Sequence, residues 1–492
     1  MTAEKGPERL RFLWRYRCHG LRHPFRKSLL RIGIIAVTVL NLSIPESFAD
    51  YKQDIGYTAL RAEQGSRLPD GSKSPPVTQT EAATAVDHDR NDQTDPIKVW
   101  MPNPGHSEFK GKKIFNRSGS LPYYSGHATG TGVLFYGRKR SLTPGINSVE
   151  SYRASHWLGP GLLRSDSPFK PHTSPSRVGN HSWVASINGN NSAVLRRIDW
   201  VVATDETTQV VGPCRPNNPL LGSAFNTIAV GQAVGENGNG TAAVDSVYTP
   251  GRTCPQLVAP RKTASAAAPV VAAAATLLIE LGHERPALST DPVAQHSADR
   301  NGRTVYNAER SEVIKAALMA GADRVTRNTE VIGDTAIDIV DYRAIPAHQA
   351  VNGLDRRYGA GQVNIENSYH ILAGGETNAS EDMPGTGGVI GPHGFDYDPA
   401  FGGADGSNAL ASYVFTVDKN SLHLWAALVW NVDIDAGAGP HFVGTPKLYN
   451  LDLFLYDVTA AGKPRLVTAS ASSADNSENL WVKLDKDHRY MI

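Results

Sequence analysis

The stretch Thr263-Ala264-Ser265-Ala266-Ala267-Ala268-Pro269-Val270-Val271 carries the strongest fold signal in the sequence. Alanine dominates as far as Glu280, with the apolar residues 276–279 near the end, and predicts a buried helix whose small side chains permit close packing. Gly282 is expected to end this helix. Ser265 lies at its start, where the positive end of the helix dipole and small neighbours suit a nucleophile. Because serine is also a preferred N-cap residue, an ordinary capping serine is the alternative.

Working outward from this helix, short apolar segments recur and are typical of strands. A helical stretch at residues 192–198 lies between two of them. Such alternation of buried strands with helices predicts an α/β fold with a mostly parallel sheet covered on both faces. The predicted strands are residues 77–80, 132–136, 181–184, 200–203, 208–211 and 227–230.

The overall composition excludes several functions. The chain has 492 residues, and 49 Lys and Arg against 48 Asp and Glu give a formal net charge of +1. No overall field is left to hold a phosphate backbone, so we do not expect nucleic acid as a partner. The 46 Gly and 31 Pro fit a mixed α/β protein with many turns better than a helical bundle.

The first 49 residues have the order of a signal peptide. Basic side chains fill residues 1–31, the apolar run 32–40 follows, and Ser47-Phe48-Ala49 offers small residues for cleavage before Asp50. We therefore expect a secreted or periplasmic protein with no stable membrane anchor after cleavage. An uncleaved anchor is the alternative, although the apolar run is shorter than the roughly 20 residues that span a bilayer. No later segment is expected to span.

Residues 50–95 are polar and rich in turns, so we expect the folded core to begin near Val77. The chain has three cysteines, and Cys18 would leave with the signal peptide. Cys214 and Cys254 could then form one disulfide in an oxidising compartment, or remain two free buried thiols. Two lone cysteines do not favour a zinc site.

The C-terminal part has a different composition. Residues 374–408 are rich in Gly, Asn and Asp and predict a linker, with a domain boundary near residue 390. Beyond it, strand-like segments at 413–417, 422–430 and 451–456 predict a small β-sandwich over residues 391–492. The sequence stops directly after a strand-like segment, a pattern that fits a truncated chain.

Two motifs resemble those of the subtilisin-like serine proteases. The serine segment is similar to that family's Gly-Thr-Ser, three small residues, then Pro, with Ser265 and Pro269 in place and Thr263-Ala264 replacing Gly-Thr. Ser125-Gly126-His127-Ala128-Thr129 resembles its Gly-His-Gly-Thr motif, with Ala128 in place of Gly. The resemblance implies that His127 is the general base for Ser265. The order acid, His, Ser along the chain also matches.

The acidic member departs from the family pattern. The strand Val77-Thr78-Gln79-Thr80 leads to Glu81, where the family carries Asp. Glutamate can orient an imidazole as aspartate does if its backbone lies one methylene further back. Glu81 is therefore the expected acid, Asp87 is the second candidate, and a surface carboxylate is the alternative for both.

Three more segments resemble family landmarks. Residues 179–184 resemble the Asn-x-Ser strand that lines the substrate cleft, 224–231 the core strand ending in Ile-Ala-Val-Gly, and 357–364 the segment that closes the domain. The oxyanion-binding asparagine is harder to place. Direct counting puts Cys214 or Arg215 there, whereas a small shift would place Asn217 or Asn218.

No metal or organic cofactor is implied by a motif. The histidines, among them His106, His283 and His296, are scattered and expected on the surface. The Asp-rich stretches at 396–398 and 433–435 do not follow a calcium-loop pattern, so calcium rests on family resemblance alone.

The sequence therefore predicts a subtilisin-like domain over residues 50–390 that hydrolyses peptide bonds in protein or peptide substrates by acyl transfer. Only 77 − 50 = 27 residues separate Asp50 from Val77, too few for a folded propeptide domain. A catalytically silent binding protein is the alternative. A third hypothesis, carbohydrate binding, rests on Trp425, Trp430 and Trp481, and strand-borne Trp is more often core. The substrate and the oligomeric state stay open.

Overall fold

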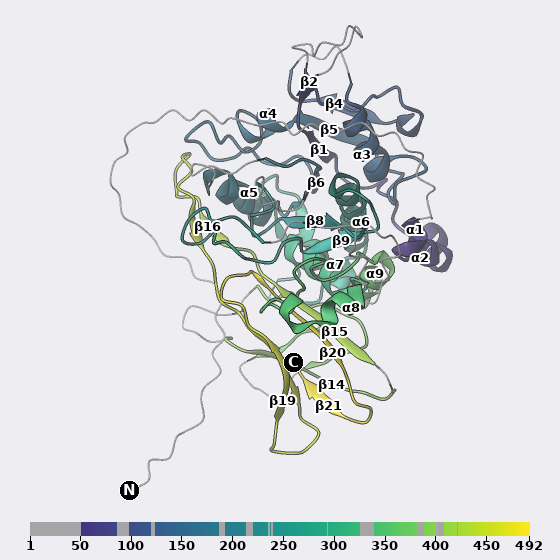
Figure 1. Cartoon of the computed structure of the whole chain (residues 1–492), viewed down its shortest axis with the longest axis vertical. Coiled ribbons are helices and arrows are strands. Elements are labelled where there is room, and N and C mark those ends of the chain that lie inside the picture. Colours follow the sequence, from purple (N-terminus) through teal and green to yellow (C-terminus); the bar gives the residue numbers. More distant parts are fainter. Residues whose placement is uncertain are drawn as a thin grey trace.

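The architecture comes from a computed structural model of the whole chain (Figure 1). The residues that it describes are 51–85, 98–119, 124–185, 192–212, 220–234, 237, 240–292, 294–324, 339–381, 388–399, 401, 408–420 and 422–492.

A seven-stranded sheet forms the centre of the larger unit, and all of its strand pairs are parallel. The predicted α/β class is therefore confirmed. In spatial order the strands are β4 (Lys113–Asn116), β5 (Ser148–Arg153), β1 (Val77–Glu81), β6 (Val178–His181), β7 (Thr208–Val211), β8 (Ile228–Gln232) and β9 (Leu257–Ala259).

Helices cover both faces of this sheet. Val210 faces the core that contains α3 (Gly126–Tyr136) and α6 (Ala264–Glu284), whereas Val211 faces the core that contains α4 (Ala154–Leu158) and α5 (Ser192–Asp205). Alternate side chains of a strand point to opposite faces, so both faces of β7 are buried. The other helices are α7 (Ser311–Ala320), α8 (Ile339–Ala344) and α9 (Ile365–Ala373).

Helix α6 fills the middle of the core. It is long and apolar enough to cross a membrane, although we expected no segment after the leader to be so. The helix is, however, largely buried inside the fold. The prediction that Gly282 ends it is also wrong. A Cβ at Gly282 would lie 2.8 Å from the carbonyl carbon of Ala308, so this glycine permits a close approach of two backbones and the helix continues to Glu284.

Two predicted strands are helical, and a third ends early. Residues 132–136 form the second half of α3, and residues 200–203 lie in α5. Short apolar runs look alike in a buried strand and in a helix buried between layers, so periodicity alone could not separate them. The strand expected at residues 181–184 instead ends at His181.

The segment after residue 50 is helical, not the turn-rich stretch that we expected. Helices α1 (Tyr51–Asp54) and α2 (Tyr57–Gln64) precede β1, and four of this segment's apolar side chains join the main core. Figure 1 shows both helices at one side of the molecule, and α2 packs against α9. The core therefore begins before Val77. The buried residues are Tyr51, Ile55, Tyr57 and Leu60.

Mainly antiparallel sheets make up the C-terminal unit (Figure 1), and the pair β13 (Gly388–Val389) with β14 (Ala411–Thr416) is parallel. The largest sheet takes β12 (Ser380–Glu381) and β13 onto β14, so strands ahead of residue 391 contribute to it. Its other members are β18 (Leu453–Asp457), β19 (Arg465–Ser470) and β21 (Arg489–Met491). Two separate two-stranded sheets pair β15 (His423–Val429) with β20 (Ser477–Lys483) and β16 (Asp433–Asp435) with β17 (Thr445–Lys447).

Short elements complete the described chain. They are the pairs β2 (Thr84–Ala85) with β3 (Lys98–Val99) and β10 (His296–Ala298) with β11 (Thr304–Tyr306), and the 3-10 turns Gly65–Arg67, Ser107–Phe109, Pro286–Leu288, Asn307–Glu309 and Pro346–His348.

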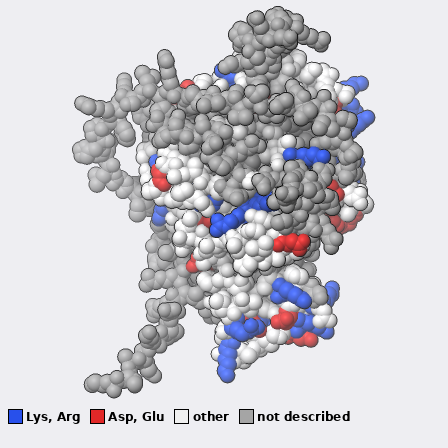
Figure 2. Space-filling view, in the orientation of Figure 1, with Lys and Arg blue, Asp and Glu red and all other residues white. Residues whose placement is uncertain are grey.

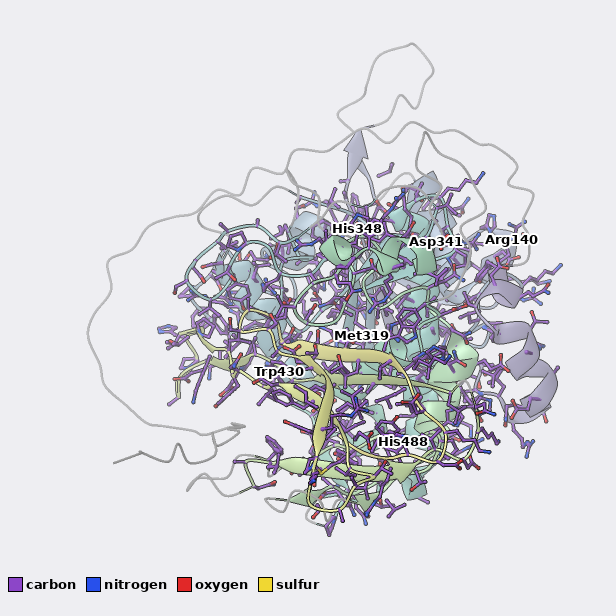
Figure 3. The ribbon with its side chains drawn as sticks, turned by 60° about the horizontal axis from the view of Figure 1, so that its bottom comes forward. Arg140, Met319, Asp341, His348, Trp430 and His488 are labelled. Carbon is purple, nitrogen blue, oxygen red and sulfur yellow. The ribbon has the colours of Figure 1, made fainter. Side chains whose placement is uncertain are left out.

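The C-terminal unit packs closely on the larger one. Strand β15 packs on α7, and Val432 and Ile434 join the core around α5. Met319 of α7 and Trp430, directly after β15, are both buried and are labelled in Figure 3. Trp430 is a core residue, and Trp425 pairs with Trp481 across β15 and β20 with both rings partly covered. These positions fit strand packing better than a carbohydrate-binding surface.

Charged side chains of both signs are interspersed over the described part of the face shown in Figure 2, in keeping with the net charge of +1.

Candidate active site

The carboxyl edge of the parallel sheet brings the predicted site residues together. Strand β1 ends at Glu81 and β6 at His181, and Thr80 pairs with His181 in the register of these neighbours. The residues that follow each strand therefore emerge side by side. In open α/β sheets the carboxyl ends of the strands are where ligands bind.

Glu81 is in direct contact with His127. The Nδ1 atom of His127 lies 2.8 Å from Oε2 of Glu81. His127 is the second residue of α3, whose first turn is fixed by Ser125, because the Ser125 hydroxyl accepts a hydrogen bond from the backbone N–H of Ala128 at 3.0 Å. The carboxylate therefore holds the imidazole by one nitrogen and leaves Nε2 for another partner.

The environment shifts both pKa values of this pair. Burial alone would lower the pKa of His127, but the hydrogen bond and the charge of Glu81 outweigh it and raise that pKa above its ordinary value. Burial raises the pKa of the Glu81 carboxyl, against the effect of its hydrogen bonds with His127 and the Ala82 backbone. His127 thus becomes the stronger base that proton abstraction from a hydroxyl requires.

Ser265 is the second residue of α6 and does not cap that helix. The cap is Thr263, whose hydroxyl accepts from the backbone N–H of Ala266 at 3.2 Å. The interpretation of Ser265 as an ordinary N-cap serine is therefore wrong. Its own hydroxyl donates to the backbone carbonyl of Ser182 at 3.3 Å, directly after β6.

The hydrogen bond between Ser265 and His127 is not formed in this structure. The Ser265 hydroxyl is bound to the Ser182 carbonyl, and Nε2 of His127 is buried without a hydrogen-bond partner among the described residues. Helices α3 and α6, which carry the two residues near their N-termini, pack against each other. Catalytic hydrogen bonds are often long or unformed in ligand-free structures and tighten when substrate binds.

The family landmarks occupy connected positions. Residues 179–184 run along β6 to Ser182 and Trp183, and residues 224–231 contain most of β8. In the third landmark, the N–H of Val363 donates to the carbonyl of Val258 at 2.8 Å, so this segment continues the sheet beside β9. Gly359, with a φ of 62°, makes the turn before it.

Several sequence predictions lie outside the described residues. These are the second acid candidate Asp87, the oxyanion candidates Asn217 and Asn218 with Cys214 and Arg215 by direct counting, and the whole signal-peptide segment. Cys254 is in a disulfide, and the other two cysteines of the chain, Cys18 and Cys214, are outside the described residues.

The other histidines have structural contacts. His283 is exposed and pairs with Glu309 at 2.9 Å, and His106 accepts a hydrogen bond from the Glu108 backbone N–H. His181, which sequence analysis did not single out, is buried, and burial lowers its pKa to about 4.

In the described part of the chain, one group of three side chains has its possible metal-ligand atoms close together. The ligand atoms of Glu63, Glu366 and His370 all lie within 4.8 Å of one another. The group lies on α2 and α9, which carry none of the candidate catalytic residues, and Nε2 of His370 already lies 3.1 Å from Oε2 of Glu63. Neither Asp-rich stretch supplies such a group among the described residues.

The described residues form an α/β fold with a His127–Glu81 pair at the end of β1 and a serine near the N-terminus of α6. No protein-family model and no curated protein matches the chain. Among solved structures, the chain is similar to the prenylagaramide maturation protease PagA, with 13% identity, a TM-score of 0.36 and coverage of 61% of this chain and 95% of that chain. It is also similar to a mutant of the protease domain of PatA, with 12% identity, a TM-score of 0.36 and coverage of 62% of this chain and 98% of that chain. Similarity this low carries no argument about the site, which rests on the contacts above.

Proposed function

We propose that the chain is a serine endopeptidase of the subtilisin-like class, acting on protein or peptide substrates. The observation that carries the proposal is the 2.8 Å contact between His127 Nδ1 and Glu81 Oε2, at the sheet edge where Ser265 meets Ser182. The base and the nucleophile come from two motifs that resemble those of the family, and the acid is Glu81 where the family carries Asp.

The reaction follows the usual acyl transfer. When substrate binds, the Ser265 hydroxyl turns from the Ser182 carbonyl to Nε2 of His127, which takes its proton as Oγ attacks the scissile carbonyl carbon. The imidazolium, stabilised by the Glu81 carboxylate, then gives this proton to the leaving amine as the C–N bond breaks. Water then attacks the acyl carbon as His127 takes one of its protons. The C–Oγ bond breaks, His127 returns the proton to Oγ of Ser265, and the carboxylic acid product leaves.

The developing oxyanion needs a hydrogen-bond donor. The backbone N–H of Ser265 lies in the first turn of α6, where a helix offers no acceptor of its own. We infer that this N–H contributes, with a second donor from the segment that contains Asn217 and Asn218. Loss of one such donor typically costs about 10²–10³ in turnover.

We also propose that the protein works outside the cytoplasm, after cleavage behind Ala49. The basic and apolar leader supports this location, and so does the disulfide at Cys254, because disulfides persist in oxidising compartments. No organic cofactor enters the proposal, and calcium rests on the family resemblance alone.

A second candidate function is binding without catalysis. It is favoured by the Ser265 hydroxyl, which donates to the Ser182 carbonyl rather than to His127. The two candidates differ in whether Ser265 is activated.

A fluorophosphonate probe tests this difference. The full chain is treated with the probe, and the labelled residue is located by mass spectrometry, in the wild type and in Ser265→Ala and His127→Ala. Ser155→Ala is the matched control, because Ser155 is the second residue of α4 and is similarly half-buried, but has no side-chain cap beside it. We expect label on Ser265 alone, lost in both site variants and unchanged in the control. A folded chain that takes no label would favour the binding protein.

A further inference from the structure

A line of side-chain hydrogen bonds crosses three strands beneath the candidate site. The indole Nε1 of Trp183 donates to Oγ1 of Thr80 at 2.6 Å. The same oxygen lies 2.7 Å from Nδ1 of His181, and Nε2 of His181 lies 2.7 Å from Oε1 of Gln209. All four side chains are buried, Thr80 and His181 completely. The line therefore starts at Trp183, just after β6, and passes to Thr80 on β1. It then returns to His181 on β6 and ends at Gln209 on β7.

The orientation of the Gln209 amide in the structure sets the direction of the line. The Gln209 amide nitrogen donates to Oγ1 of Thr207 at 2.8 Å, so its oxygen faces His181 and accepts. Nε2 of His181 must then carry the proton, and Nδ1 accepts from the Thr80 hydroxyl. This neutral tautomer leaves no buried polar atom of the line unsatisfied, and burial supports it by disfavouring imidazolium.

A glycine makes room for this arrangement. Gly179 pairs with Gln209 across β6 and β7. A Cβ at position 179 would lie 2.1 Å from Oε1 of Gln209 and 3.1 Å from Nε2 of His181. Any side chain there would displace the bond between the two residues, so the sequence of β6 is compatible with the line only because residue 179 is glycine.

The line ends beside the reacting groups. Thr80 directly precedes Glu81, the carboxylate that holds His127. Trp183 directly follows Ser182, the residue whose carbonyl accepts from Ser265. The Trp183–Thr80 hydrogen bond therefore joins the backbone next to the acid to the backbone next to the nucleophile's partner, across residues 103 apart in the chain.

We propose that Thr80, His181, Trp183 and Gln209 form a positioning network that sets how closely Ser265 can approach His127. The inference rests on the proposed protease function and deepens it by assigning residues that touch no reacting atom. A displacement of about 1 Å can cost about 10²-fold in rate, so a small shift between β1 and β6 is enough.

Thr80→Val tests the network, because valine keeps the shape of threonine and removes the hydroxyl. We expect the rate of fluorophosphonate labelling at Ser265 to fall by about 10- to 100-fold, with kcat for a peptide substrate falling and KM little changed. Thr80→Ser keeps a hydroxyl and should recover the rate to within a few-fold. A folded Thr80→Val protein that labels at the wild-type rate would overturn the proposal.

Thr78→Val is the matched control. Thr78 is buried two residues earlier on the same strand, and its hydroxyl bonds to Ser176 at 2.9 Å, away from the line. It should lose similar stability without slowing the labelling. Equal slowing in both variants would mean a general loosening of β1 and would contradict a positioning role. If Thr80→Val does not fold, Trp183→Phe removes the indole N–H together with part of the ring and carries the same expectation.

A spectroscopic measurement separates this proposal from the protease proposal. ¹⁵N NMR of the wild-type chain should show His181 as the neutral tautomer with the proton on Nε2, whether or not Ser265 takes label. The Nδ1–H tautomer or an imidazolium at neutral pH would overturn the network. An unlabelled chain with the expected tautomer would overturn only the protease function.

Discussion

The carboxyl edge of the parallel sheet and the joint between the two units are both held by buried hydrogen bonds, but of different kinds. At the edge, the contact that holds the candidate base joins two side chains, His127 and Glu81. At the joint, asparagine side chains bond to backbone. The Asn226 side chain accepts a hydrogen bond from the N–H of Val432 at 2.8 Å and donates one to the carbonyl of Val432. The Asn476 side chain donates to the carbonyls of Phe225 and Trp430.

This difference separates function from stability. Side chains at the edge can be replaced by similar ones without leaving buried backbone unpaired, so their loss should remove activity more than stability. Loss of a joint asparagine leaves backbone groups buried and unsatisfied, which costs stability directly. We therefore expect the two units to unfold together, because the joint includes Phe225 and Asn226, which lead into β8.

Glu81→Gln should have the largest effect and act on activity alone. The amide keeps the size of the side chain but no longer favours the productive imidazole tautomer, so we expect a loss of about 10⁴ in kcat with little change in thermal unfolding. Glu81→Asp restores the charge one methylene short and should recover part of the rate. If Glu81→Gln retains most of the activity, Glu81 is not the acid.

Glu81→Gln also tests the pH dependence of activity. The raised pKa of His127 means that activity is lost as pH falls through a midpoint above its ordinary 6.5, because imidazolium cannot accept the serine proton. Without the Glu81 charge this midpoint should move to lower pH. Rates of Ser265 labelling between pH 5 and 9 measure it, and an unmoved midpoint would contradict the assignment of the acid limb to this pair.

Asn226→Ala should show the opposite pattern at the joint. It leaves the N–H and the carbonyl of Val432 unpaired, so the free energy of unfolding should fall by about 2–4 kcal/mol. Labelling of Ser265 per folded molecule should stay near the wild type. Urea unfolding measures the loss, and Asn301→Ala, which removes one bond from an exposed asparagine, is the control expected within about 0.5 kcal/mol. Equal losses in both would remove the distinction between joint and surface.

Ser125→Ala should have the smallest effect of these variants. We expect it to lower both stability and activity slightly, between the loss of activity at the edge and the loss of stability at the joint. It removes the cap of α3 and should cost about 1 kcal/mol, with at most a few-fold loss of activity because Glu81 still holds His127. Thr263→Ala removes the exposed cap of α6 and should cost less. A complete loss of labelling in folded Ser125→Ala would show that the cap, not the acid, orients the base.

The sequence predicted the α/β class, and both helix-borne candidate residues, His127 and Ser265, carried a signal. Ser265 and His127 each stand within a few consecutive residues that set a helix start, so the chemistry leaves a local pattern. The short apolar runs at 132–136 and 200–203 carried no such pattern, and the helices that contain them could not be told from strands.

Other features depend on pairs far apart in the chain. Thr80 and Trp183 are unremarkable alone, and only the parallel register of β1 and β6 brings them together. The asparagines of the joint have the same property. Gly179 was the nearest thing to a signal, since a glycine inside a strand often marks the close approach of another group.

The packing of α1 and α2 has a consequence for the order in which the chain can fold during synthesis. The N–H of Ile365 donates to the carbonyl of Ile55, and the Gln362 side chain donates to the carbonyl of Asp54, 308 residues earlier. An eight-residue helix such as α2 is too short to persist alone. We therefore expect residues 51–64 to gain their full packing only after α9 has been synthesised, about 300 residues later, so this early segment stays open to proteases for most of synthesis.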